Sequence, residues 1–161
     1  MFVGGGTGGH FYPLIAVAER LNTYAQKGHD YKLFYIGPDK YDEGELTKNN
    51  ITYIYCPAGK KRRYFSPLNV IDAFKNFYGF FVAVWKLYEV YPDVLFTKGG
   101  FTSVPVTLAA AFLRIPIVVH ESDSKPGRAN KIAAKFARHI AISFDACAKY
   151  FPAKKTALTG I

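Results

Sequence analysis

The sequence is poor in acidic residues, in cysteine and in long apolar runs. Its 161 residues include 12 Asp and Glu but 21 Lys and Arg, which gives a net charge of +9 at pH 7. A strongly basic chain favours an anionic partner, which could be nucleic acid, an acidic membrane or a phosphorylated substrate. Composition alone does not choose among these three partners.

The few cysteines and the absence of a long apolar run exclude several classes of protein. Cys56 and Cys147 stand far apart and in no metal-binding pattern, so we predict two reduced thiols, no disulfide framework, no metal site and no cofactor. Because no run of about 18 uncharged apolar residues is present, we expect no membrane-spanning helix. The N-terminus is already a glycine loop, so we expect no signal peptide. Half of the residues are hydrophobic, enough for one domain over residues 1–161.

The most informative stretch that is present is the opening, MFVGGGTGGHFYP. Residues 1–3 predict the end of a buried strand, five of residues 4–9 are glycine, and Pro13 suits the first turn of a helix. Such a loop presents backbone N–H groups at the positive end of a helix, where an anionic group can approach closely. A tight turn in any α/β domain would also use glycine. The candidate ligand-binding residues of this loop are Thr7, Gly8 and Gly9.

The loop does not match the two commonest nucleotide-binding patterns. No lysine follows Gly9, as it would in a Walker loop, and Gly37-Pro38 stands where a nicotinamide-binding fold carries an acidic residue. His10 comes directly after the loop. An imidazole titrates near neutrality and could act as a general base, or it could simply cap the loop.

Strands and helices alternate along the rest of the chain. The expected strands lie at 31–36, 51–56, 93–97, 115–120, 139–143 and 156–159. The expected helices lie at 13–27, 42–49, 68–88, 104–113 and 128–138, with a short one from Asp145. This order predicts an α/β fold with a doubly wound, Rossmann-like parallel sheet. Ligands of such sheets bind beyond the carboxyl ends of the strands, where we expect three segments to meet: 4–10, 98–103 and 120–123.

The second and third segments carry further candidates, each with an ordinary alternative. Gly99, Gly100 and Phe101 form a second glycine loop that could complete an anion cradle, and Ser103 could serve the ligand or cap the next helix. The other candidates are Glu121, Asp123 and Asn130. The two carboxylates could act as an acid–base pair or bind a sugar hydroxyl, or they could belong to a solvated turn. Asn130 could be an ordinary polar residue on a helix.

A basic cluster precedes an unusually aromatic helix over 68–88. Apolar residues occur on nearly every face of this helix, which one buried stripe does not explain. We interpret the region as a membrane-surface patch, with cations for anionic headgroups and aromatics for the interface. The alternative is a core helix with solvated cations; nucleic-acid binding would use similar residues but fits the rest of the fold less well. The candidate membrane residues are Lys60, Lys61, Arg62, Arg63, Tyr64, Phe65, Phe81 and Trp85.

Three blocks, in order and over essentially the whole chain, together resemble the MurG family of bacterial N-acetylglucosaminyltransferases. The blocks are GGTGGH at 5–10, GGFTSVP at 99–105, and PIVVHE at 116–121 with PGRANK at 126–131. That family converts lipid I to lipid II in peptidoglycan synthesis by an inverting, metal-independent transfer of GlcNAc from UDP-GlcNAc. The resemblance implies a GT-B enzyme of two Rossmann-like domains, in which residues 1–161 are the N-terminal, acceptor-side domain and a C-terminal donor-binding domain is absent from this chain.

The resemblance also implies roles for the candidates. His10 would be the base or positioning residue for the muramyl 4-hydroxyl, and the two glycine loops would approach the phosphates of donor and lipid-linked acceptor. The basic and aromatic segment would lie on the cytoplasmic face of the bacterial plasma membrane, as a peripheral contact.

Two features depart from the family pattern. Ser122 and Asp123 replace a Gln and an Asn, so Asp123 cannot donate the hydrogen bonds of an amide, and Phe101 replaces a common Tyr. A different lipid acceptor therefore stays open, as in a glycolipid-forming relative or the membrane-anchoring half of a split enzyme of the dolichol pathway. A non-catalytic membrane-binding scaffold also stays open.

Overall fold

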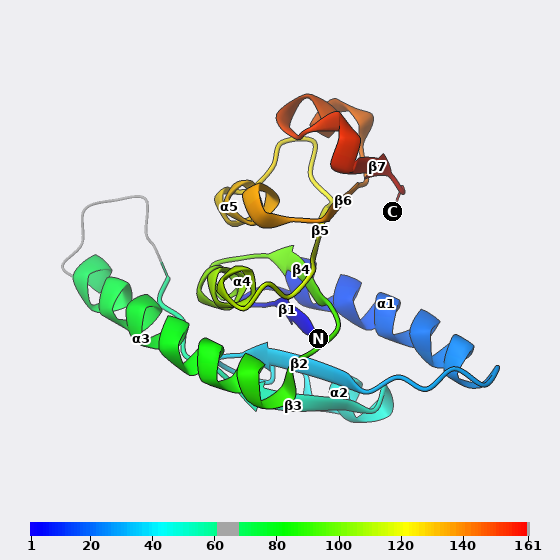
Figure 1. Cartoon of the computed structure of the whole chain (residues 1–161), viewed down its shortest axis with the longest axis horizontal. Helices are drawn as coiled ribbons and strands as arrows, with labels where there is room; N and C mark the ends of the chain where they lie inside the picture. The colour runs from blue at the N-terminus through cyan, green and yellow to red at the C-terminus, as the bar shows by residue number, and fades with distance from the viewer. Residues whose placement is uncertain (61–67, 161) are drawn as a thin grey trace.

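The computed structural model describes residues 1–60 and 68–160, which form one seven-stranded parallel sheet with helices on both faces (Figure 1). The strands are β1 (Phe2–Gly4), β2 (Leu33–Gly37), β3 (Ile51–Tyr55), β4 (Leu95–Gly99), β5 (Ile117–Glu121), β6 (His139–Ile142) and β7 (Thr156–Leu158). The helices are α1 (Gly8–Ala25), α2 (Glu43–Lys48), α3 (Leu68–Val90), α4 (Ser103–Phe112) and α5 (Arg128–Phe136), followed by the 3₁₀ turns η1 (Asp145–Tyr150) and η2 (Ala153–Lys155).

The strand order is β3-β2-β1-β4-β5-β6-β7, and every neighbouring pair is parallel. The chain runs outward from β1 to β3 and then returns to place β4 on the other side of β1. The order of strands therefore reverses between β1 and β4, which is the point where doubly wound sheets bind ligands. The predicted α/β fold with a doubly wound parallel sheet is confirmed.

Each face of the sheet has its own hydrophobic cluster. Successive side chains of a strand point to opposite faces. Phe2 accordingly packs with α1 and α2, whereas Val3 packs with α3, α4 and α5. Figure 1 shows α3, α4 and α5 along one side of the sheet and α1 on the other. Within the described residues, no helix is both long enough and apolar enough to cross a membrane.

The first helix begins five residues before the predicted start. Thr7 is its N-cap residue in an extended conformation, so α1 starts at Gly8 and Pro13 lies inside the helix rather than in its first turn. Glycine has a poor helix propensity, which is why the sequence pattern places Gly8 and Gly9 in the loop. The shift puts His10 in the first turn of α1.

Two predicted strands also begin and end later than the pattern indicates. The strand expected at 93–97 is β4, which ends at Gly99, and the strand expected at 115–120 is β5, which ends at Glu121. Lys98, Gly99 and Glu121 are therefore held in the sheet and do not belong to mobile loops. Lys98 and Glu121 both line a cleft at this edge of the sheet.

Candidate functional site

The two glycine loops meet at the reversal point of the sheet. Gly4 of β1 pairs with Gly99 of β4, and the backbone of Gly100 lies directly against the first loop. A Cβ at Gly100 would stand 2.8 Å from the Gly5 carbonyl oxygen and 3.4 Å from Cγ of His10, and Gly100 has a φ of +82°. Only glycine allows this conformation and this approach together. The expected convergence of these two segments is present.

The loops open into a cleft of about 610 Å³. Its lining includes residues from the ends of β4 and β5, from α1, and from the start of α5. The predicted site residues that line it are Gly9, His10, Gly100, Phe101, Glu121, Asp123 and Asn130. One cleft therefore holds candidates from all three predicted segments.

His10 is held by its neighbour in the capping turn. Its Nδ1 lies 2.7 Å from Oγ1 of Thr7, and no described residue forms a hydrogen bond with its Nε2. When Nδ1–H donates to the threonine, Nε2 carries the free lone pair that a general base needs. Burial lowers the pKa of His10, the charge of Lys98 lowers it further, and Asp123 and Glu121 oppose the shift. The two largest causes therefore favour the neutral imidazole over the imidazolium.

Glu121 organises the turn that follows β5. Its Oε1 accepts a hydrogen bond from the Asp123 N–H at 3.1 Å, and its Oε2 accepts from the Gly127 N–H at 3.0 Å and from Nδ2 of Asn130 at 3.0 Å. Both oxygens of this buried carboxylate are thus used within the protein. Asp123 is exposed at the mouth of the cleft, where its carboxylate faces the ligand space.

Asn130 joins three elements beneath the cleft. Its Nδ2 donates to the Lys98 carbonyl at 3.4 Å, to the His120 carbonyl at 3.2 Å and to Glu121. A Cβ at Gly99 would stand 2.6 Å from its Oδ1, so this side chain fills the space beside the second glycine loop. Asn130 is buried; it is not an ordinary exposed polar residue, and it positions β4 and β5 relative to α5.

The remaining residues of the second loop differ in what they offer a ligand. The Ser103 hydroxyl donates to the Gly100 carbonyl at 2.9 Å. Ser103 is the first residue of α4 and does not cap it, since the N-cap is Thr102, whose side chain makes no capping hydrogen bond. The Phe101 ring packs against Gly6 and lines the cleft. Phe101 therefore gives the cleft an apolar lining, whereas the Ser103 hydroxyl is used in a hydrogen bond within its own loop.

Four polar residues that line the cleft are not among the predicted site residues: Asn76, Lys98, Ser122 and Arg128. Lys98 falls in the predicted loop at 98–103, but it is buried at the end of β4, and its Nζ donates to Oγ of Ser122 at 2.6 Å. Asn76 of α3 exchanges two hydrogen bonds with the backbone of Gly59, at 2.9 and 3.0 Å. Asn76 and Gly59 both line the cleft, and no feature of the sequence distinguishes Asn76 from Asn69 of the same helix.

The predicted membrane residues fall into two groups. Residues 61–65, which include Lys61, Arg62, Arg63, Tyr64 and Phe65, lie outside the described residues. Lys60 is exposed, and on α3 Phe81 and Trp85 are 54% and 66% exposed. Ala83 and Leu87 of the same helix are fully buried, so α3 packs through one narrow face and leaves its aromatic faces uncovered.

The residues at 1–60 and 68–160 contain no group of three or more His, Cys, Asp or Glu side chains that could hold a metal ion. Cys56 and Cys147 are buried and unpaired with each other. Burial raises the pKa of the Cys56 thiol to about 12, so it stays protonated and unreactive.

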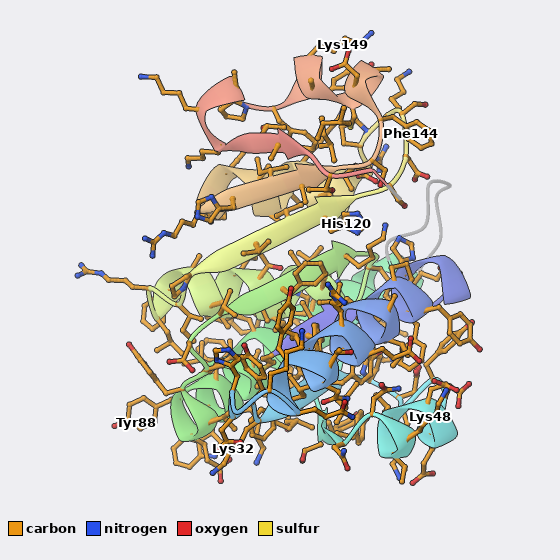
Figure 2. The ribbon with its side chains drawn as sticks, turned by 90° about the vertical axis from the view of Figure 1, so that its right-hand side faces the viewer. Lys32, Lys48, Tyr88, His120, Phe144 and Lys149 are labelled. Atoms are coloured by element: carbon orange, nitrogen blue, oxygen red, sulfur yellow. The ribbon has the colours of Figure 1, made fainter. Side chains whose placement is uncertain are left out.

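A second histidine lies near the site. Figure 2 shows His120 at the end of β5, where its Nε2 lies 3.4 Å from Oγ of Ser143.

Known proteins match the chain over nearly its whole length. Residues 1–142 match the glycosyltransferase family 28 N-terminal domain. Proteins of Lachnospira eligens and Staphylococcus haemolyticus are 43% and 44% identical over 99% of the chain, and both are named UDP-N-acetylglucosamine--N-acetylmuramyl-(pentapeptide) pyrophosphoryl-undecaprenol N-acetylglucosamine transferase. The crystal structure of Acinetobacter baumannii MurG superposes with a TM-score of 0.78 at 26% identity over 99% of the chain.

These matches confirm the resemblance to the MurG family that the sequence blocks indicate. The chain spans 44% of the length of each of the three proteins.

Proposed function

Because this chain belongs to the glycosyltransferase family 28 N-terminal domains, we propose that it is the acceptor-side domain of an inverting N-acetylglucosaminyltransferase. The enzyme would transfer GlcNAc from UDP-GlcNAc to the 4-hydroxyl of lipid I, the undecaprenyl-pyrophosphate-linked acceptor, and give lipid II. One observation carries this proposal. Two glycine loops and an imidazole with a free ring nitrogen open into the same cleft, at the reversal point of the sheet.

His10 is the proposed base. Its Nε2 would take the proton of the acceptor 4-hydroxyl while that oxygen forms a bond to the anomeric carbon of GlcNAc. The bond from that carbon to UDP breaks, and its electron pair leaves on the β-phosphate oxygen. The pKa of His10 is lowered mainly by burial, which favours the basic form of the ring. The donor would be held largely by a second domain.

The first glycine loop is the proposed phosphate contact. The N–H groups of His10 and Phe11 both donate to the Thr7 carbonyl, whereas no described residue accepts from the N–H groups of Gly8 and Gly9. Free N–H groups in the first turn of an 18-residue helix lie at the positive end of its dipole and suit an anionic oxygen. The pyrophosphate of the lipid acceptor would lie there.

The exposed face of α3 is the proposed membrane contact. Asn76 of α3 lines the cleft, so a lipid whose headgroup fills the cleft could leave it along this helix. Trp85 is exposed, and Figure 2 shows Tyr88 on α3 pointing away from the body of the protein. Aromatic side chains of this kind suit the interface of a membrane. We therefore place the domain on the cytoplasmic face of the bacterial plasma membrane, with the anionic surface as a partner.

Transfer of labelled GlcNAc tests the proposed function. The chain would be joined to the C-terminal half of the Staphylococcus haemolyticus relative and incubated with UDP-[¹⁴C]GlcNAc and lipid I. We expect labelled lipid II, and a fall in turnover of about 10²-fold or more for the His10→Ala variant. If the label were transferred only to a different lipid acceptor, lipid I would not be the substrate. Full turnover by the His10→Ala enzyme would remove the base assignment.

A further inference from the structure

Lys98 is a buried cation at the floor of the cleft. It is 3% exposed, and its ammonium donates one hydrogen bond, to the neutral hydroxyl of Ser122 at 2.6 Å. No carboxylate oxygen of any described residue lies within the 4.0 Å of an ion pair, and its other two N–H bonds have no described acceptor. A buried ammonium without a counter-ion is unfavourable unless a ligand completes its surroundings.

Two carboxylates act on Lys98 from a distance, but neither forms an ion pair with it. Burial lowers the pKa of Lys98, and the charges of Glu121 and Asp123 raise it. His10 and His120 face it from α1 and β5, and its charge lowers the pKa of both rings. Glu121 already accepts three hydrogen bonds from N–H donors. Asp123 is exposed to solvent, which screens its charge. The ammonium therefore keeps unused donors toward the cleft that it lines.

We propose that Lys98 binds an oxygen of a diphosphate group in the cleft, with the Ser122 hydroxyl as a second donor to the same group. Nζ already donates to Oγ of Ser122, so the hydroxyl proton is free to donate onward. A charge-assisted hydrogen bond from a buried lysine is stronger than one from a backbone N–H. Lys98 would thus complement the N–H groups of Gly8 and Gly9. The inference rests on the proposed function only for the identity of the molecule that carries the diphosphate.

Calorimetry on the 161-residue chain tests this assignment. Inorganic pyrophosphate is the first probe, and the variants are Lys98→Met, which keeps an apolar stem of similar length, and Lys125→Met. Lys125 is exposed in the turn after β5 and does not line the cleft, so it controls for the loss of one positive charge. We expect the Kd of pyrophosphate to rise about tenfold or more in Lys98→Met and less than about twofold in Lys125→Met.

Two further probes distinguish the sources of the diphosphate. Geranyl pyrophosphate represents the lipid acceptor and UDP represents the nucleotide donor. A tenfold loss for geranyl pyrophosphate alone assigns Lys98 to the acceptor, and a loss for UDP alone assigns it to the leaving group. Either result supports the diphosphate site. Equal affinity of Lys98→Met and the parent for all three probes would overturn it.

A purely structural role gives a different result. If Lys98 only balances the nearby carboxylates, Lys98→Met lowers the thermal midpoint and leaves the three Kd values unchanged, which also overturns the proposal. Unfolding is followed by circular dichroism in the same samples, so that only folded protein is compared. A failure of the transfer assay with intact pyrophosphate binding would contradict the proposed function and leave the Lys98 site standing.

Discussion

At the scale of single residues, the site depends on how His10 is oriented. The hydrogen bond between Nδ1 of His10 and Oγ1 of Thr7 is the only one that a described residue forms with this ring. The same hydroxyl makes no capping bond to the helix. We therefore expect Thr7 to be a positioning residue, because its hydrogen bond can fix both the ring and its tautomer while leaving Nε2 open.

Replacement of Thr7 tests this role. In the joined two-domain enzyme, we expect Thr7→Val to lower kcat about tenfold or more with little change in KM, because the substrate still binds but the base is less well oriented. Thr7→Ser keeps the hydroxyl and should restore most of the rate. Steady-state kinetics of both variants provide the measurement. A Thr7→Ser enzyme as slow as Thr7→Val would contradict this role, because serine keeps the hydroxyl that is proposed to orient the ring.

The pH dependence of the base belongs to the same scale. After burial, the positive charge of Lys98 is the next cause that lowers the pKa of His10, while Asp123 and Glu121 raise it. An ammonium disfavours the imidazolium form, so Lys98→Met should raise the pKa of His10. The midpoint of the His10 ring signals in a ¹H NMR titration should then lie at higher pH, and the acid limb of the kcat/KM profile should shift to higher pH with it.

Lys125→Met is the matched control for this titration, since it removes an equal charge from an exposed position. We expect it to leave the His10 midpoint almost unchanged. A midpoint in Lys98→Met that stays fixed or moves to lower pH contradicts the electrostatic link between the β4 lysine and the base.

At the scale of elements, the site depends on the contact between the two glycine loops. We expect Gly100→Ala to destabilise the protein by about 1–3 kcal/mol and to weaken pyrophosphate binding, because φ of +82° and the Gly5 carbonyl 2.8 Å from the new Cβ both oppose a side chain. Gly127→Ala is the control. Its φ is −64° and nothing lies within 4 Å of the added Cβ, so in urea unfolding the variant should lose no more than about 1 kcal/mol of stability, the usual cost of alanine at an N-cap. Gly127 lines the cleft, so this variant is a control for stability only, and binding is measured by calorimetry on the parent and Gly100→Ala.

The elements also show what the sequence could predict. Alternation of apolar strands and amphipathic helices identified the order of elements, and glycine pairs located both loops. The pattern placed the start of α1 and the ends of β4 and β5 wrongly by a few residues, since glycine and lysine disfavour regular structure locally and tertiary contacts override that preference here. Lys98 was missed for this reason. Its burial results from α1 and the turn after β5, which are distant in sequence.

At the scale of the whole molecule, the cleft and the aromatic helix lie on connected surfaces. α3 packs against α4 through residues such as Ala83 and Leu87, while Phe74, Phe77 and Trp85 stay exposed. In the proposed membrane contact, a net charge of +9 would attract the whole domain to an anionic surface. The aromatic side chains would then set which face docks, and Asn76 of the same helix would keep the cleft near the lipid headgroups.

Vesicle sedimentation tests this arrangement. The parent chain should sediment with vesicles that contain anionic phosphatidylglycerol and much less with neutral phosphatidylcholine vesicles, and raising the salt should release it. The double variant Phe81→Ser and Trp85→Ser should lower the partition coefficient about tenfold or more, because each exposed ring loses its apolar contact with the interface.

Phe144→Ser is the control. It removes a ring that is 42% exposed and follows β6, and Figure 2 shows Phe144 at the opposite end of the molecule from Tyr88 of α3. This control should bind like the parent. Equal loss in both variants would mean that general hydrophobicity, not the α3 face, directs membrane binding, and no loss in either would leave the basic charge as the whole cause.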